Sequence, residues 1–128
     1  MDYLLDTHTV LWFFNGNKTS LSDTAKNIIQ SQQYIKFVSM VSVWEVGIKI
    51  NIGKLVFPQN TNGFVHQIQK NGFELLPINA SHIAAIEQLP LIHRDPFDRL
   101  LVATAIVEQM GLLSCDANIK QYPVNYIW

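Results

Sequence analysis

The sequence predicts an α/β fold with a mainly parallel sheet of about four to five strands. Short apolar runs that are typical of buried strands alternate along the chain with segments whose apolar residues recur at helical spacing. Two of the apolar runs lead into an aspartate, Asp6 and Asp116. Polar side chains in such positions are expected where parallel strands end, which is the edge at which open α/β sheets bind ligands.

Composition predicts one globular domain over residues 1–128. The chain is 48% hydrophobic and 15% charged, and its formal net charge of -1 argues against broad electrostatic binding to nucleic acid without excluding a local site. The single Cys115 excludes an internal disulfide framework and a cysteine-built zinc site. No apolar run approaches the ~20 residues of a membrane span and no basic leader is present, so a soluble cytoplasmic protein without membrane contact is expected.

The first elements follow from residues 3–14. Tyr3-Leu4-Leu5 reads as a buried strand that delivers Asp6 to the start of a helix near Thr9. Residues 10–14, Val-Leu-Trp-Phe-Phe, are apolar on every side of that helix, whereas a helix on a small domain needs only one buried stripe. We therefore expect part of this helix to meet another chain, which predicts a homodimer and a groove for a partner helix.

The later elements are predicted by the same periodicities and by their start and stop residues. They are a helix starting at Ser20 or Ser22, a strand over 34–38, a helix over 39–52 ended by Gly53, a polar loop over 60–62, a short helix over 64–68, a strand over 73–78, a helix over 81–89, a helix over 96–110 broken by Gly111, a strand over 112–115 and an edge strand over 126–128.

Two acids lie at the start of the helix that begins at Pro96. Proline fits the first helical position, which makes Asp95 the N-cap and Asp98 the third helical residue. A purely structural role is open to both, because Asp95 can cap the helix and Asp98 can complete a capping-box-like pair. The same alternative applies to Asp6, which can cap the helix after it.

A third acid, Glu45, lies within an apolar helix. It is the only carboxylate between Asp23 and Glu74, and a lone buried acid is costly unless something pairs with it. Ser42 stands at capping-box spacing and Lys49 at salt-bridge spacing, so a structural role remains open here too. A helix capped by Ser39 would not need the capping box.

The acids are expected to converge. Asp6 and Asp116 follow strands, while Glu45 and Asp98 lie early in helices, and right-handed crossovers bring such positions to one edge of a parallel sheet. Crowded carboxylates repel one another, so a cluster implies a compensating cation. Because every ligand is an oxygen, Mg²⁺ or Mn²⁺ is expected.

Four segments together resemble one family. They are Leu4-Leu5-Asp6-Thr7, residues 39–45, residues 97–105 (Phe-Asp-Arg-Leu-Leu-Val-Ala-Thr-Ala) and Leu113-Ser114-Cys115-Asp116. In this order they are similar to the PIN-domain ribonucleases, specifically the VapC-like toxins of toxin–antitoxin pairs. The resemblance covers essentially the whole chain and implies a three-layer α/β/α fold.

The resemblance also implies roles for residues. Asp6, Glu45 and Asp98 match the family's metal-site acids, and Asp116 matches a fourth, more variable one. Thr7 and Ser114 are auxiliary candidates, and Ser114 falls where the family often places a Thr or Ser that supports the site. Asp95 is an extra acid outside the pattern, an N-cap first and an auxiliary acid second. Asn118 departs from the family pattern, in which a further Asp is often found, and His8 replaces a small polar residue. Asp116 is therefore the least secure ligand.

The implied activity is metal-dependent hydrolysis of RNA phosphodiester bonds by an activated water, leaving 5′-phosphate and 3′-hydroxyl ends. Without the four site acids, the chain has nine basic residues against six acidic ones. The candidates for contact with the RNA backbone are Lys49, Lys54, Arg94 and Arg99. A cognate antitoxin protein is the implied partner.

Two other classes of function compete with this interpretation. Phosphoryl-transfer domains of the haloacid-dehalogenase type also place an Asp after the first strand, but they need a second Asp two residues later, where this chain has His8. A non-catalytic PIN-like module that binds RNA or protein is the remaining alternative.

Overall fold

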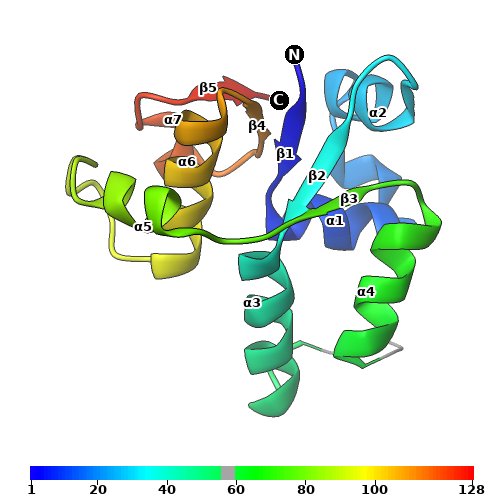
Figure 1. The fold of residues 1–128 in the computed structure, drawn as a ribbon. Coiled ribbons are helices and arrows are strands. Elements are labelled where there is room, and N and C mark those ends of the chain that lie inside the picture. The colour runs from blue at the N-terminus through cyan, green and yellow to red at the C-terminus, as the bar shows by residue number, and fades with distance from the viewer. Residues whose placement is uncertain (56–59) are drawn as a thin grey trace.

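A computed structural model describes residues 1–55 and 60–128 and contains a five-stranded sheet (Figure 1). The strand order is β3-β2-β1-β4-β5, and all four neighbouring pairs are parallel. The strands are β1 (Tyr3–Leu5), β2 (Lys36–Ser39), β3 (Glu74–Leu76), β4 (Gly111–Leu113) and β5 (Asn125–Ile127). The predicted α/β class is confirmed, with a sheet that is parallel throughout its described strands.

Helices connect successive strands. They are α1 (Thr7–Phe14), α2 (Asp23–Gln30), α3 (Met40–Asn51), α4 (Thr61–Lys70), α5 (Ala80–Ile86), α6 (Pro96–Glu108) and α7 (Ala117–Lys120), with a short 3₁₀ turn, η1 (Lys18–Ser20). In the described part of the chain, no helix has the length and apolar character that a membrane crossing requires.

The sheet separates two hydrophobic cores because successive strand residues point to opposite faces. Leu5, Val38 and Leu113 face the core formed with α1, α2 and α4. Leu4 and Leu112 face the other core, which α5, α6 and α7 cover. Figure 1 shows these two groups of helices on opposite sides of β1. The architecture is therefore the three-layer α/β/α arrangement that the resemblance implied.

Serine side chains start two of the helices, as the sequence suggested. Ser22 caps α2 by accepting a hydrogen bond from the backbone N–H of Ala25 at 3.0 Å. Ser39 caps α3 through the N–H of Val41, also at 3.0 Å. The capping-box role considered for Glu45 is therefore ruled out, because α3 begins before Ser42.

The aromatic residues of α1 pack against other segments of the same chain. Phe13 contacts Phe73 with ring centroids 5.7 Å apart, and Phe14 contacts Phe64 at 5.8 Å. Trp12 packs near the C-terminal Trp128. These three side chains nevertheless stay partly exposed, so the expected contact of this helix with another chain stays a prediction.

The end of α6 differs from its prediction. Gln109 ends the helix in the left-handed conformation, with φ of 55°, and Gly111 is the first residue of β4. A Cβ atom at Gly111 would lie 2.8 Å from the ring of Tyr3, so the glycine is needed for close packing between strands. The helix α4 is also longer than predicted, and η1 and α7 were not predicted.

Candidate active site

The candidate site lies where the strand order reverses. From β1 the chain adds β2 and β3 on one side, and then crosses over to place β4 and β5 on the other. Ligands of open α/β sheets bind at such a switch point, outside the carboxyl ends of the strands. The N–H of Asp6 donates to the carbonyl of Leu113 at 3.0 Å, which joins the ends of β1 and β4.

Asp6 is buried at this edge, with only 4% of its surface exposed. Its Oδ1 accepts a hydrogen bond from the N–H of Thr9 at 2.8 Å, so it does cap α1. Burial raises the pKa of the Asp6 carboxyl, while hydrogen bonds from Ser114 and Thr9 act in the opposite direction. The capping hydrogen bond engages Oδ1, so capping does not explain the role of the second carboxylate oxygen, Oδ2.

Asp98 is not a capping residue. Asp95 is the N-cap of α6 and accepts hydrogen bonds from the N–H groups of Phe97 and Asp98 at 2.9 and 3.1 Å. The Asp98 Oδ2 instead lies 3.2 Å from Nε2 of His93. Burial raises the Asp98 pKa to about 6, and the charges of Asp95, Asp116 and Asp6 add to the increase. Asp6 at the start of α1, Asp98 in the first turn of α6 and Asp116 after β4 therefore lie close enough for their charges to interact.

Asp116 is half-buried and follows β4. It caps the short α7 through the N–H of Asn118 at 2.7 Å, and its own N–H donates to Ser114 Oγ at 3.1 Å. Burial raises the pKa of the Cys115 thiol, and the charges of Asp6 and Asp116 raise it further. The Asp6 and Asp116 carboxylates thus act on the same small region. Ser114 hydrogen-bonds the carboxylate of Asp6 and the backbone N–H of Asp116, so it lies between the two residues.

Glu45 has a different environment from the three aspartates. Thr7 Oγ1 donates to its Oε1 at 2.6 Å, and Lys49 Nζ lies 2.7 Å from its Oε2. The hydroxyls of Thr7 and Ser42 are 2.9 Å apart, so the carboxylate is part of a buried polar group. The salt bridge that the i, i+4 spacing suggested is therefore present, and Thr7 contributes to the site through Glu45.

The donor chemistry fits a hard divalent cation. Among the described residues, no three or more His, Cys, Asp or Glu side chains are arranged to hold a metal ion together. However, Mg²⁺ commonly takes one or two carboxylates and completes its shell with water, so a cage of protein ligands is not required. Asp98, with Asp6 or Asp116 beside it, supplies carboxylates whose mutual repulsion a cation would relieve.

The four basic candidates divide into two pairs. Lys49 is paired with Glu45. The Nη1 of Arg99 donates to the carbonyl of Pro90 and to the hydroxyl of Tyr122, each at 2.9 Å. These contacts favour structural roles. Lys54 and Arg94 are exposed, so both ammonium and guanidinium groups are accessible from solvent.

Sequence reasoning missed two residues beside the acids, His93 and Tyr122. His93 lies five residues before Asp98, just outside α6, and that position was the only signal available for it. Tyr122 lies in a loop after α7, where nothing in the local sequence connects it to the site. His66 is exposed and His82 is buried in packing, so neither has a place in the site.

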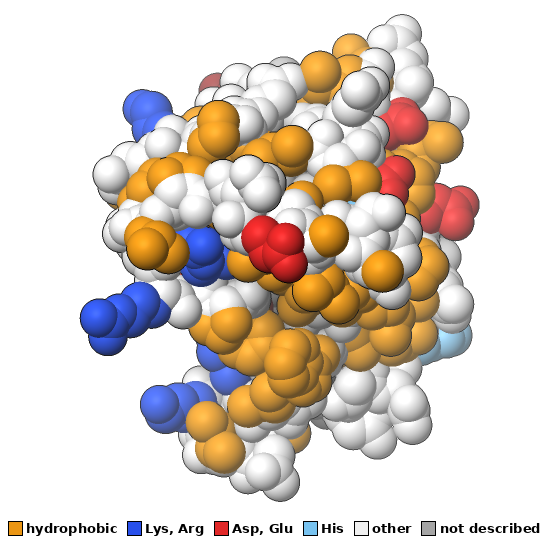
Figure 2. Space-filling model, turned by 60° about the vertical axis from the view of Figure 1, so that its left-hand side comes forward, with side chains coloured by type: hydrophobic (Ala, Val, Ile, Leu, Met, Phe, Trp, Pro, Cys, Tyr) orange, Lys and Arg blue, Asp and Glu red, His pale blue; other side chains and the backbone are white. Residues whose placement is uncertain are grey.

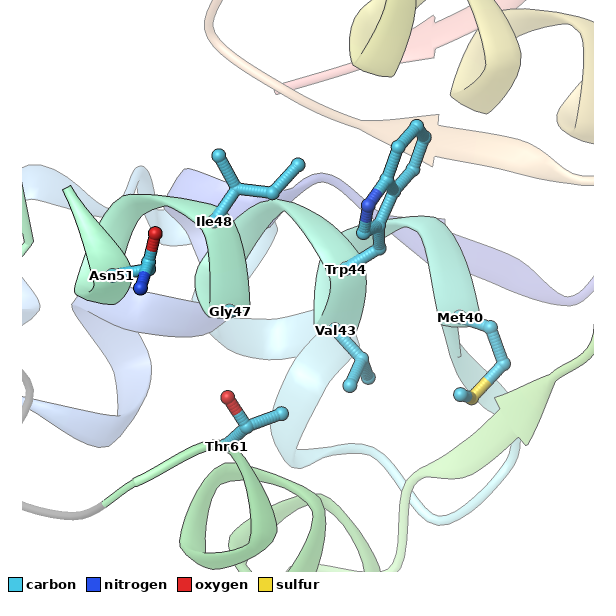
Figure 3. A pocket seen from close by; sticks show the side chains of 7 residues that line it. All are labelled: Met40, Val43, Trp44, Gly47, Ile48, Asn51 and Thr61. Carbon is cyan, nitrogen blue, oxygen red and sulfur yellow. The ribbon is translucent and has the colours of Figure 1, made fainter.

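A separate cavity of about 460 Å³ lies between α3 and α4 (Figure 3). Val43 of α3 and Thr61 of α4 face each other across it. A Cβ atom on Gly47 would lie 3.3 Å from Oγ1 of Thr61, so the glycine permits the close approach of the helices. The residues that line the cavity are Met40, Val43, Trp44, Gly47, Ile48, Asn51 and Thr61. This groove is mainly apolar and contains none of the four acids.

Comparisons with known proteins agree with this geometry. The likeness extends over nearly the whole chain of VapBC2 from Rickettsia felis bound to a promoter DNA fragment (TM-score 0.72, 18% identity, 99% of this chain and 96% of that chain). The DNA-bound VapBC of Salmonella typhimurium gives a TM-score of 0.72 at 12% identity, with 99% and 97% covered. VapBC-1 from nontypeable Haemophilus influenzae gives 0.64 at 17%, with 94% and 91% covered.

These identities are low, so the solved structures bear on the fold alone. A search of curated proteins finds no match. The model of the PIN domain, in contrast, matches residues 3–125, and these residues include β1 to β4, the first residue of β5 and the acids Asp6, Glu45, Asp98 and Asp116. With a parallel sheet in the order 3-2-1-4-5 and acids at its switch point, the chain belongs to the PIN-domain family.

Proposed function

We propose that this protein is a divalent-metal-dependent endoribonuclease and the toxin of a toxin–antitoxin pair. The observation that carries the proposal is that Asp6 and Asp116 follow neighbouring strands at the switch point, close enough to Asp98 for their charges to raise its pKa. Repulsion between neighbouring carboxylates that are shielded from water costs free energy in the metal-free protein, and a bound cation relieves this repulsion.

In this proposal Asp98 holds Mg²⁺ or Mn²⁺ together with Asp6 and, less securely, Asp116. The chemistry that such an ion supplies is polarisation of the scissile phosphate and activation of an attacking water. Glu45 contributes a fourth carboxylate when Lys49 and Thr7 release it. Ser114 orients Asp6 by a hydrogen bond, and Lys54 and Arg94 contact the RNA backbone outside the acids.

We expect the purified protein to cleave single-stranded RNA in Mg²⁺ or Mn²⁺ and to stop when EDTA is added, because no protein group replaces the cation's charge. A gel assay of end-labelled RNA measures this, and excess Mg²⁺ added after EDTA should restore cleavage. The Asp98→Asn variant, purified in parallel, controls for contaminating ribonuclease. Cleavage that persists in EDTA, or no cleavage with any divalent ion, contradicts the proposal.

A non-catalytic RNA- or protein-binding module is the competing function. The observation in its favour is that most of the acids have a structural role. Asp6, Asp95 and Asp116 each cap a helix, and Glu45 forms a salt bridge with Lys49. Asp98 is the exception, since its carboxylate caps nothing. RNA binding that survives without any cleavage would favour this second function.

The proposed partners are a cognate antitoxin and a second copy of the chain. The VapBC relatives are complexes, and the apolar groove between α3 and α4 suits an apolar helix of a partner. Figure 2 shows many hydrophobic side chains on one face of the molecule, with Lys and Arg along one edge. Exposed apolar residues include Trp44 and Ile83, each 56% exposed, and Leu91, 93% exposed.

We expect the wild type to sediment as a dimer at micromolar concentration and the double variant Ile83→Lys/Leu91→Lys to sediment as a monomer. Two buried ammonium groups at the interface would be unpaired, whereas both side chains are exposed in the single chain and their replacement leaves its core intact. Ile52→Lys, at the far end of α3, is the matched control and should stay dimeric. A monomeric wild type removes the dimer from the proposal.

A further inference from the structure

A chain of polar side chains connects Asp98 to the hydrophobic core. His93 Nε2 lies 3.2 Å from Asp98 Oδ2, and His93 Nδ1 lies 2.7 Å from the hydroxyl of Tyr122. Arg99 Nη1 donates to the same hydroxyl at 2.9 Å. The side chains of His93 and Asp98 are 13% and 19% exposed, and Tyr122 is 4% exposed. The chain of contacts is therefore largely shielded from solvent.

The direction of each hydrogen bond follows from the chemistry of its two ends. A guanidinium can only donate, so the Tyr122 oxygen accepts from Arg99. An ionised carboxylate can only accept, so His93 Nε2 carries a proton and donates to Asp98. A neutral imidazole with a proton on Nε2 must accept at Nδ1, and the Tyr122 O–H supplies that proton. Every donor and acceptor is satisfied by one tautomer of His93.

The far end of this chain is anchored. Arg99 also donates to the carbonyl of Pro90 at 2.9 Å, and its guanidinium carbon lies 5.8 Å from the centroid of the Tyr122 ring. The Tyr122 ring packs in the core that includes α6 and α7. The His93 and Tyr122 rings are also in contact, with centroids 5.4 Å apart. Neither His93 nor Tyr122 can turn without breaking several contacts.

We propose that His93 is a positioning residue that fixes the Asp98 carboxylate for a divalent cation, in a tautomer set by Tyr122 and Arg99. The His93 hydrogen bond engages Oδ2, which leaves Oδ1 free to bind the ion. Outer partners of metal ligands typically contribute 10–100-fold to metal affinity. The inference rests on the proposed function, because Asp98 needs orienting only if the site binds a metal.

Direct measurement of Mn²⁺ affinity by electron paramagnetic resonance tests this inference without an activity assay. We expect His93→Ala to weaken Mn²⁺ binding by about 10–100-fold. Tyr122→Phe keeps the ring but removes the proton donor, so it should weaken binding in the same direction. His93→Gln retains a side-chain N–H for Asp98 and should recover most of the affinity.

A second histidine–carboxylate pair provides the matched control. His82 Nε2 lies 2.8 Å from Oε1 of Glu108, away from the acids, between α5 and α6. Glu108→Gln should leave the Mn²⁺ affinity unchanged. Thermal melts of each variant without metal report packing, and a purely structural role for His93 would lower the melting temperature while the affinity stayed at the wild-type value.

The outcomes separate the inference from the proposed function. If the wild type binds Mn²⁺ and all three folded variants, His93→Ala, His93→Gln and Tyr122→Phe, bind it with the same affinity, the positioning role is overturned. The nuclease proposal stands in that case. If wild type binds no Mn²⁺, the proposed function fails and this inference fails with it. Loss of affinity in His93→Ala with recovery in His93→Gln supports both.

Discussion

Replacing Asp98 with Asn is expected to reduce RNA cleavage by orders of magnitude while the stability of the metal-free protein holds or rises. Burial and three neighbouring aspartates raise the Asp98 pKa to about 6, so its charge is unfavourable in the folded state without metal. The neutral amide relieves that cost and keeps nearly the same shape, but it removes one of the proposed metal ligands. The cleavage assay and thermal melts measure the two effects separately.

The pH dependence of the metal-free protein should change with the same substitution. Because the pKa of Asp98 in the folded protein, about 6, lies above the ordinary value of 3.8 for this carboxyl, the folded state binds the proton more tightly than the unfolded state does. The free energy of unfolding should therefore decrease as pH rises from about 4 to about 6, and the penalty then stays constant above that range. Asp98→Asn should flatten this part of the profile.

The stabilising effect of metal should also decrease in Asp98→Asn. A ligand that binds only the folded state stabilises it by roughly 2.7 kcal/mol at a hundredfold excess over Kd. The control is Asp95→Ala, which removes the N-cap of α6 and should cost about 1 kcal/mol with cleavage largely retained. Near wild-type cleavage by Asp98→Asn would disprove its role as a ligand.

Replacing Lys49 with Met is expected to lower the free energy of unfolding of the metal-free protein by about 1–3 kcal/mol, the range for leaving a buried hydrogen-bonding group without its partner. The Glu45 side chain is 5% exposed, and Lys49 is its cationic partner at 2.7 Å. Without Lys49 the buried carboxylate keeps only Thr7 as a described hydrogen-bond donor. The Lys49 side chain is 34% exposed, so solvent screens the ion pair. The expected loss of stability is therefore smaller than for breaking a fully buried ion pair.

The same variant tests whether Glu45 is a metal ligand. If it is, Mn²⁺ should stabilise Lys49→Met by more than it stabilises wild type, because the ion replaces the missing positive charge. Glu45→Gln is the matched control, since the amide still accepts from Thr7 but needs no counter-charge, and its gain from Mn²⁺ should be smaller than that of wild type. Equal gains in all three proteins would assign Glu45 to the salt bridge alone.

Much of the fold could be predicted because strand and helix periodicities are local. The five strands fell within a few residues of their predicted places, and Ser39 was recognised as a cap. Gly111 was misread because a glycine in sequence does not reveal whether the chain needs its backbone freedom or its lack of a side chain. Here the ring of Tyr3, which comes from the other end of the sequence, decides the matter.

The sequence indicated which acids follow the strands or begin the helices, and their role in a metal site stays a prediction, whereas most of their neighbours could not be predicted. Lys49 could be paired with Glu45 from the i, i+4 spacing, since a helix fixes that distance. The contact between His93 and Tyr122 depends on where α7 places a loop after packing, which no local pattern encodes. The packing of residues 10–14 was not foreseen for the same reason, because Phe64 and Phe73, which contact α1, come from distant segments.

Because β1 lies in the middle of the sheet, the order of synthesis determines when each of its two neighbouring strands becomes available for pairing. Leu4 pairs with Leu112, and the N–H of Asp6 bonds to Leu113, so the first strand finds one of its two neighbours only after residues 111–113 have left the ribosome. Pairing strands this far apart in the sequence requires the closure of a long loop, which costs chain entropy and is slow. A nascent or truncated chain that carries Asp6, Glu45 and Asp98 but ends before β4 therefore lacks both Asp116 and the strand contact that joins β1 to β4.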